Sequence, residues 1–155
     1  MRNRNFIGAA LVMTVLLLTG GCSKEISLDA QDPSWDRDVC HRCRMMLSNR
    51  HFSAQVVDPE SGRHYFFDDL GCALGWLDEA KPQWSQKAVI YANAADSGKW
   101  TDVRRGVIAE PFVTPMSFGL GVFPEQSALP EGKHRVTLEQ AFGIVRTIRE
   151  KGRRE

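Results

Sequence analysis

The part of the sequence that most constrains the fold runs from Phe52 to Ala92, where strand and helix patterns follow one another. Residues 52–57 alternate well enough to form a strand with one buried face, and residues 63–67 give a second, aromatic strand. The turn chemistry of residues 58–62 joins the two into a hairpin. A helical segment and a short apolar run over 88–92, suited to a buried strand, come next. This order of strand, strand, helix and strand predicts an α+β protein.

The helix after the hairpin has a cap, an apolar face and a stop signal. Asp68 and Asp69 precede it and are residue types that cap helix N-termini. Pro82 is expected to end the helix, because proline cannot continue the backbone hydrogen-bond pattern. Apolar side chains recur between these signals with the spacing of one helix face, at Leu70, Ala73, Leu74 and Leu77.

The second half of the chain shows a similar but less clear order. Residues 107–113 and 118–123 are predicted to be strands, separated by a turn at 114–117. Thr137 and Gln140 have the spacing of a capping box, and an amphipathic C-terminal helix follows them. We therefore expect two small strand-strand-helix-strand units packed together.

The N-terminus has the features of a bacterial lipoprotein signal. Arg2 and Arg4 precede an apolar run of about 13 residues, shorter than the ~20 that span a bilayer. The run ends in a Leu-Thr-Gly-Gly-Cys sequence that resembles a lipobox, which predicts cleavage before Cys22 and a lipid on its sulfur. The alternative is a soluble secreted protein with Cys22 in a disulfide.

These features divide the chain into three parts. Residues 1–21 are predicted to be a lipoprotein signal peptide, residues 22–37 a lipidated tether, and residues 38–155 a folded domain. The whole chain has a formal net charge of +1 and is 43% hydrophobic, which is typical of a globular protein. Such a nearly neutral chain gives no reason to expect nucleic-acid binding.

Residues 38–51, "DVCHRCRMMLSNRH", gather two cysteines, two methionines and two histidines. Thiolate and thioether sulfurs are soft donors that favour Cu(I), whereas a thioether is not among the usual ligands of zinc. Cys43 and Met45 place two soft atoms two residues apart, and Met116 can complete a low-coordinate site from a distant loop. His41 or His51 can supply a nitrogen ligand.

Other readings of the sulfur residues stay open. With Cys22 lipidated, three cysteines remain, and an oxidising compartment favours a Cys40–Cys43 disulfide. The same C-x-x-C pair suits a thiol–disulfide oxidoreductase. Met45 and Met46 can simply fill gaps in the core, and Cys72 is expected to be a small buried apolar residue. A lipoprotein that binds a partner without any metal is a third class.

Several motifs together resemble the NosL family of copper-chaperone lipoproteins. They occur in the family's order and cover most of residues 38–145: "CHRCRMM", "FSAQV", "YFFDDLGCALGWL", "SGKWTDVRRGVIA" and "TPMSFGLGVF". The resemblance implies Cu(I) carriage in the periplasm by a protein that is lipid-anchored to a bacterial membrane and is not an enzyme. It also implies transfer to a membrane copper-delivery complex with an ABC transporter, with nitrous oxide reductase as the final client.

The resemblance also implies a set of metal-site residues. Its motif positions correspond to Cys43 and Met45 first, then to Met116, with Cys40 and His51 as further members. One departure stands out, because Arg44 occupies the place between the second cysteine and the methionine where the family usually has glycine.

Overall fold

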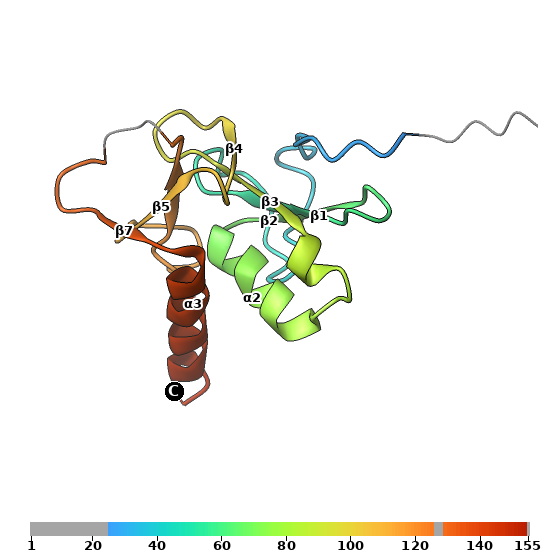
Figure 1. Cartoon of the computed structure of the whole chain (residues 1–155). Helices are drawn as coiled ribbons and strands as arrows, with labels where there is room; N and C mark the ends of the chain where they lie inside the picture. The colour runs from blue at the N-terminus through green and yellow to red at the C-terminus, as the bar shows by residue number, and fades with distance from the viewer. Residues whose placement is uncertain (1–24, 126–128, 155) are drawn as a thin grey trace, which may run out of the picture.

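The computed structural model describes residues 25–125 and 129–154, and over these residues the chain is an α+β protein, as the sequence predicts. Figure 1 shows two antiparallel sheets with helices α2 and α3 beside them. The larger sheet has the strand order β2-β1-β3-β4 and the smaller one β6-β5-β7. The elements are β1 (Ala54–Val57), β2 (His64–Phe67), α2 (Leu70–Ala80), the 3₁₀ turn η2 (Ser85–Lys87), β3 (Val89–Asn93), β4 (Trp100–Asp102), β5 (Val107–Glu110), β6 (Gly121–Phe123), β7 (His134–Val136) and α3 (Leu138–Gly152).

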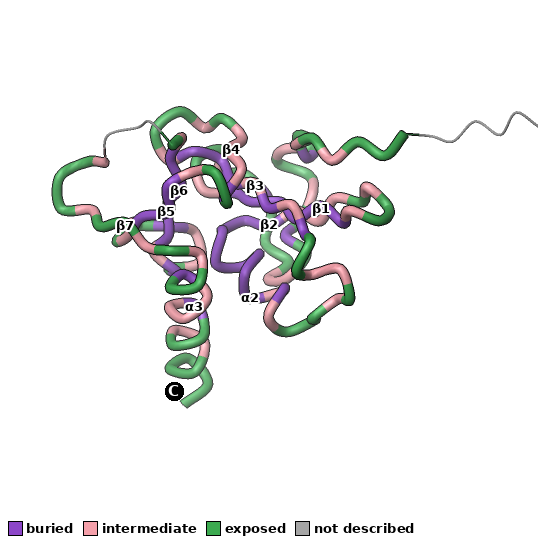
Figure 2. The backbone as a smooth tube through the Cα atoms, viewed as in Figure 1, coloured by how far each residue is buried: buried purple, intermediate pink, exposed green. Residues whose placement is uncertain are grey.

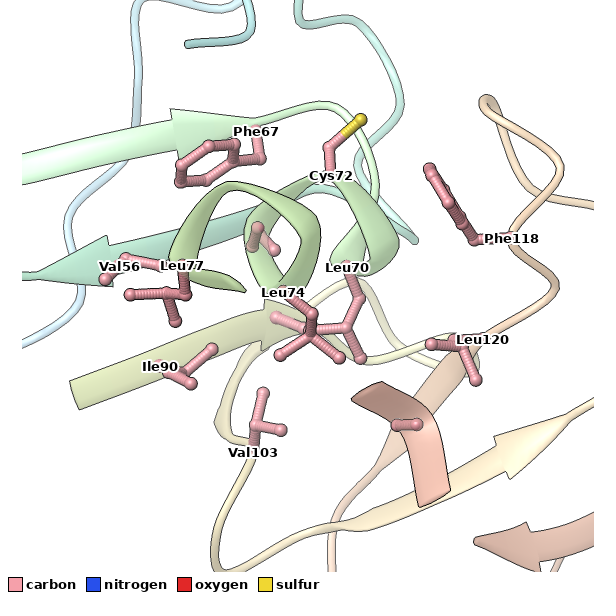
Figure 3. Packing of buried hydrophobic residues seen from close by; sticks show 14 of the residues in the cluster. Val56, Phe67, Leu70, Cys72, Leu74, Leu77, Ile90, Val103, Phe118 and Leu120 are labelled. Carbon is pink, nitrogen blue, oxygen red and sulfur yellow. The ribbon is translucent and has the colours of Figure 1, made fainter. Parts of the chain in front are cut away.

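The first unit has the predicted order of strand, strand, helix and strand. β1 and β2 form the expected hairpin, in which Val56 pairs with Tyr65, and β1 pairs with β3 on its other side. The aliphatic face of α2 covers this sheet. Figure 3 shows Leu70, Leu74 and Leu77 of α2 close to Val56 and Ile90 of the strands.

α2 begins and ends where the sequence signals place it. The N-cap is Asp69, whose carboxylate accepts a hydrogen bond of 2.6 Å from the backbone N–H of Gly71. The helix ends at Ala80, and Lys81 then adopts a left-handed conformation with φ of 42° just before Pro82. The N-cap and the C-terminal stop signal fix the two ends of α2, and thereby the position of each side chain along the helix.

The second unit contains shorter strands than the sequence predicts, and its three strands all precede its helix. β5 ends at Glu110 because the next residue, Pro111, has no backbone N–H for a sheet ladder. β4 and β7 were not predicted, since strands of three residues are too short to show an alternating pattern. The predicted capping box of α3 is confirmed: Thr137 N–H donates to Gln140 Oε1 at 2.7 Å, and Gln140 N–H donates to Thr137 Oγ1 at 3.1 Å.

α2 and α3 are held together by packing and by ion pairs. Ala141 and Val145 of α3 are buried in the same core cluster as the apolar residues of α2, and Figure 2 shows the outer side of α3 exposed. Asp78 of α2 accepts hydrogen bonds from Arg146 at 2.7 Å and from Arg149 at 3.2 Å. One core therefore includes both units.

Residues 25–37, the described part of the expected tether, lie against the first sheet. Gln31 and the buried Gln55 of β1 exchange two hydrogen bonds, of 3.1 and 2.9 Å. Trp100 of β4 donates its indole N–H to Asp32 and stacks on Trp35. The predicted signal peptide and Cys22 lie outside the described residues. Within those residues, the structure has no helix with the length and apolar character needed to cross a bilayer.

The contact between Gly71 and Phe118 gives a test of how the second unit packs on α2. A Cβ at residue 71 would overlap the Phe118 ring, so Gly71→Ala is expected to lower the free energy of unfolding by about 1–3 kcal/mol. Gly143→Ala on α3 is the matched control, because no atom lies within 4 Å of its added Cβ, and it should stabilise by up to about 1 kcal/mol. Urea unfolding of both variants measures the difference. Equal stability would show that Phe118 does not pack there.

Candidate metal centre

Three thiols from two separate parts of the sequence meet at one end of α2. The Sγ atoms of Cys40, Cys43 and Cys72 all lie within 4.8 Å of one another, and all three cysteines are free. Thiolates bound to one ion at about 2.3 Å are separated from each other by roughly 4 Å. The three sulfurs can therefore hold a metal ion after only small side-chain movements.

Cys40 and Cys43 are presented by a tight hairpin over residues 38–47. Its two arms are joined by Cys40 N–H to Met45 O at 2.7 Å and by Leu47 N–H to Asp38 O at 2.9 Å. Arg44 closes the turn in a left-handed conformation with φ of 67°, and its N–H donates to Cys40 O. This conformation favours glycine, which the NosL pattern usually has at this place. The backbone here adopts it with an arginine.

The hairpin is fixed to the edge of the first sheet. His41 N–H donates to Phe66 O of β2 at 2.8 Å. The imidazole of His41 packs edge-on against Tyr65 and Trp76, with ring centroids 5.0 and 5.3 Å apart. Partial burial among these rings lowers the pKa of His41. These contacts place the two hairpin cysteines against the start of α2.

Cys72 is buried, as expected, and the structure also brings its sulfur within 4.8 Å of the other two thiols. It lies in the first turn of α2, with its N–H bonded to Asp69 O at 2.9 Å. Figure 3 shows its sulfur on the opposite side of the helix from Leu74. The sequence around Cys72 carries no signal for this, because its meeting with Cys40 and Cys43 depends on how residues 38–47 dock against the fold.

The three thiols differ in their readiness to ionise. A hydrogen bond from the Cys72 thiol lowers the pKa of Cys40 to about 4, assisted by the backbone N–H of Cys43 and opposed by burial. The same hydrogen bond, together with burial, raises the pKa of Cys72. Burial is also the main reason why the pKa of Cys43 is raised. Without metal, the interaction between Cys40 and Cys72 therefore favours ionisation of the Cys40 thiol over that of Cys72.

Two buried carboxyl groups lie beside the thiolate. Burial, followed by the negative charge of Cys40, raises the pKa of Asp68 to about 6. Burial also raises the pKa of Asp69, although its hydrogen bonds oppose this effect. Negative groups that repel one another in a buried space create a site that favours a cation.

The other predicted site residues are Met45, Met116 and His51, which lie on three different segments of the chain. Met45 follows Cys43 on the hairpin and is 50% exposed. Met116 is partly buried against the core cluster that contains Cys40 and Cys72, and its N–H donates to Asp69 at 3.2 Å. His51 lies in the turn before β1, and its Nδ1 is 3.2 Å from the backbone oxygen of Ala95, which follows β3. The ligand roles of Met45, Met116 and His51 stay predictions.

Comparison with known proteins adds no relative. No protein-family model matches the chain, and no curated protein is similar to it.

The lowered pKa of Cys40 gives a spectroscopic prediction. A group with a pKa of about 4 is ionised above that pH, so the metal-free reduced protein should show the ultraviolet absorbance of one thiolate at pH 6. Cys72→Ala removes the hydrogen bond with the largest effect, and should move this titration upward, toward the ordinary cysteine range. Absence of a thiolate signal in the folded protein at pH 6 would contradict the proposed charge state.

Proposed function

We propose that the protein is a Cu(I)-binding metallochaperone, lipid-anchored to a bacterial membrane in the periplasm, that delivers copper for maturation of nitrous oxide reductase. The observation that carries the proposal is the convergence of the Cys40, Cys43 and Cys72 sulfurs within 4.8 Å. Three thiolates form a soft ligand set, and such sets favour Cu(I) over hard cations. The likeness of the sequence motifs to the NosL family supplies the client and the compartment.

Copper rather than zinc is favoured by the donors around the cluster. A closed zinc site has four nitrogen, sulfur or carboxylate ligands in a tetrahedron. Here the cluster has three sulfurs, and the thioethers of Met45 and Met116 are the candidates for a further donor. Thioether sulfur is a soft ligand that suits Cu(I).

The exposure of the three cysteines suits a carrier. Cys40 and Cys72 are 0% exposed, whereas Cys43 is only partly buried. A ligand from a partner protein would therefore approach the ion from the Cys43 side, so copper passes through an intermediate bound by both proteins. No covalent bond of a substrate is made or broken, so the proposed role is not enzymatic.

The proposed anchor explains how a small protein finds its partners. A lipid on Cys22 would confine the domain to the membrane surface, where a copper-delivery complex with an ABC transporter also resides. Confinement raises the effective concentration of the two proteins without requiring a large interface. We propose this complex as the immediate partner and nitrous oxide reductase as the final client.

The cysteine cluster predicts which substitutions abolish metal binding. In a Cys22→Ser background, the only remaining thiols are Cys40, Cys43 and Cys72, and the reduced protein should bind about one Cu(I) in competition with a chromogenic chelator. Cys43→Ser and Cys72→Ser should each weaken binding by about 100-fold or more, because removing a ligand costs more than the 10–100-fold typical of residues around ligands. Circular dichroism checks that the variants fold. Unchanged Cu(I) affinity in folded Cys72→Ser would remove Cys72 from the site.

The thioethers are tested separately. Met45→Leu and Met116→Leu keep side-chain volume and remove the sulfur, and each should weaken Cu(I) binding by about tenfold if the thioether is a ligand. Met46→Leu is the matched control on the same hairpin, with 54% exposure, and should bind as the unchanged protein does. Equal affinity in all three variants would leave a site made of cysteines alone.

The alternative function is a periplasmic thiol–disulfide oxidoreductase that uses Cys40 and Cys43. The low pKa of Cys40 favours it, since a thiolate is the attacking species in disulfide exchange. Burial counts against it, because Cys40 is 0% exposed and the more accessible Cys43 has a raised pKa. This alternative predicts disulfide exchange that does not depend on Met45 or Met116, together with weak Cu(I) binding.

A further inference from the structure

Arg42 lies between two cysteines of the cluster in the sequence and turns its side chain toward the third. Its guanidinium lies close enough to Cys72 for the charges of the two groups to interact. Nε and Nη2 also donate to the two carboxylate oxygens of Glu79, both at 3.1 Å. The side chain is only 21% exposed, so its charge is largely shielded from solvent.

The surface of α2 is shaped to receive this side chain. Cys72, Gly75 and Glu79 follow one another on one face of the helix, at the spacing of successive turns. A Cβ at Gly75 would lie 3.2 Å from Arg42 Nε, so the missing side chain leaves room for the guanidinium. The ring of Phe118, which faces Cys72 in Figure 3, lies 5.9 Å below the guanidinium carbon.

The loaded site creates a charge problem that Arg42 can relieve. Three thiolates and one Cu(I) have a net charge of −2, and a buried net charge is costly unless an opposite charge offsets it. The nearby Asp68 and Asp69 are acidic and cannot offset it. The single charge of Glu79 is shared between Arg42 and Arg149, so Glu79 does not fully neutralise Arg42.

We propose that Arg42 is the counter-charge of the metal centre: its guanidinium stabilises the Cys72 thiolate and positions it as a ligand. The proposal rests on the proposed Cu(I)-binding function and adds a residue outside the ligand set to it. The competing explanation is purely structural, in which Arg42 only fastens the hairpin to α2 through Glu79.

Three substitutions separate the two roles. Arg42→Gln removes the charge, Arg42→Lys keeps it, and Glu79→Gln breaks the ion pair while leaving the guanidinium beside Cys72. If Arg42 is the counter-charge, Arg42→Gln should lower Cu(I) affinity by about tenfold, the size expected for a hydrogen bond to a charged group. Arg42→Lys should recover most of this loss, and Glu79→Gln should retain full affinity because it frees the guanidinium charge.

A second metal ion distinguishes charge from structure. Cd²⁺ bound by the same three thiolates gives a net charge of −1 rather than −2, so the loss in Arg42→Gln should be clearly smaller for Cd²⁺ than for Cu(I). Cu(I) is measured by chelator competition and Cd²⁺ by the absorbance of its thiolate complex, in the full-length protein with Cys22→Ser. A structural defect would weaken both ions equally.

The proposal is overturned if Arg42→Gln keeps its Cu(I) affinity, if Glu79→Gln loses as much affinity as Arg42→Gln, or if the loss is equal for both ions. Glu79→Gln tests it even if Arg42→Gln does not fold, because a loss of affinity in that variant contradicts the counter-charge role. Failure of the unsubstituted protein to bind Cu(I) would instead remove the proposed function itself.

Discussion

The candidate metal centre depends on the hydrogen bonds that the buried carboxylate of Asp69 accepts. One oxygen accepts the Gly71 N–H at 2.6 Å and thereby starts α2, which presents Cys72. The other accepts the Met116 N–H at 3.2 Å, so the carboxylate holds the loop before β6 against the same helix end. Burying a carboxylate is costly unless hydrogen bonds compensate. Here those bonds join the two units of the fold.

Around this junction, each part of the site is fixed by a different kind of contact. The hairpin that presents Cys40 and Cys43 is held by its own backbone bonds and by the bond from His41 N–H to Phe66 O at the sheet edge. The aliphatic face of α2 packs on the first sheet, and α3 packs against another face of α2. The three sulfurs therefore meet because these separate contacts position the hairpin and α2 beside each other.

The sequence predicted those parts of the fold that depend on short-range patterns. The β1–β2 hairpin, the Asp69 cap and the capping box of α3 are all set by residues within a few positions of one another. β4 and β7 were missed because three residues show no periodicity. Cys40 and Cys43 were recognised as a pair from their spacing, but Cys72 was not, since its place beside them depends on the hairpin docking at the edge of β2. That tertiary contact leaves no trace in local spacing.

The unequal burial of the three sulfurs also bears on how an ion would leave. Cys40 and Cys72 are fully buried, and the backbone N–H of each is hydrogen-bonded, so they form the base of the site. Cys43 is less buried and lies in the hairpin turn, directly before Arg44 with its left-handed conformation. Exchange of a bound ion would therefore begin at Cys43, with the two buried sulfurs holding the ion until a partner's ligand replaces the third. This asymmetry suits the proposed carrier role, because three equally buried thiolates would leave a bound ion without a route for its release.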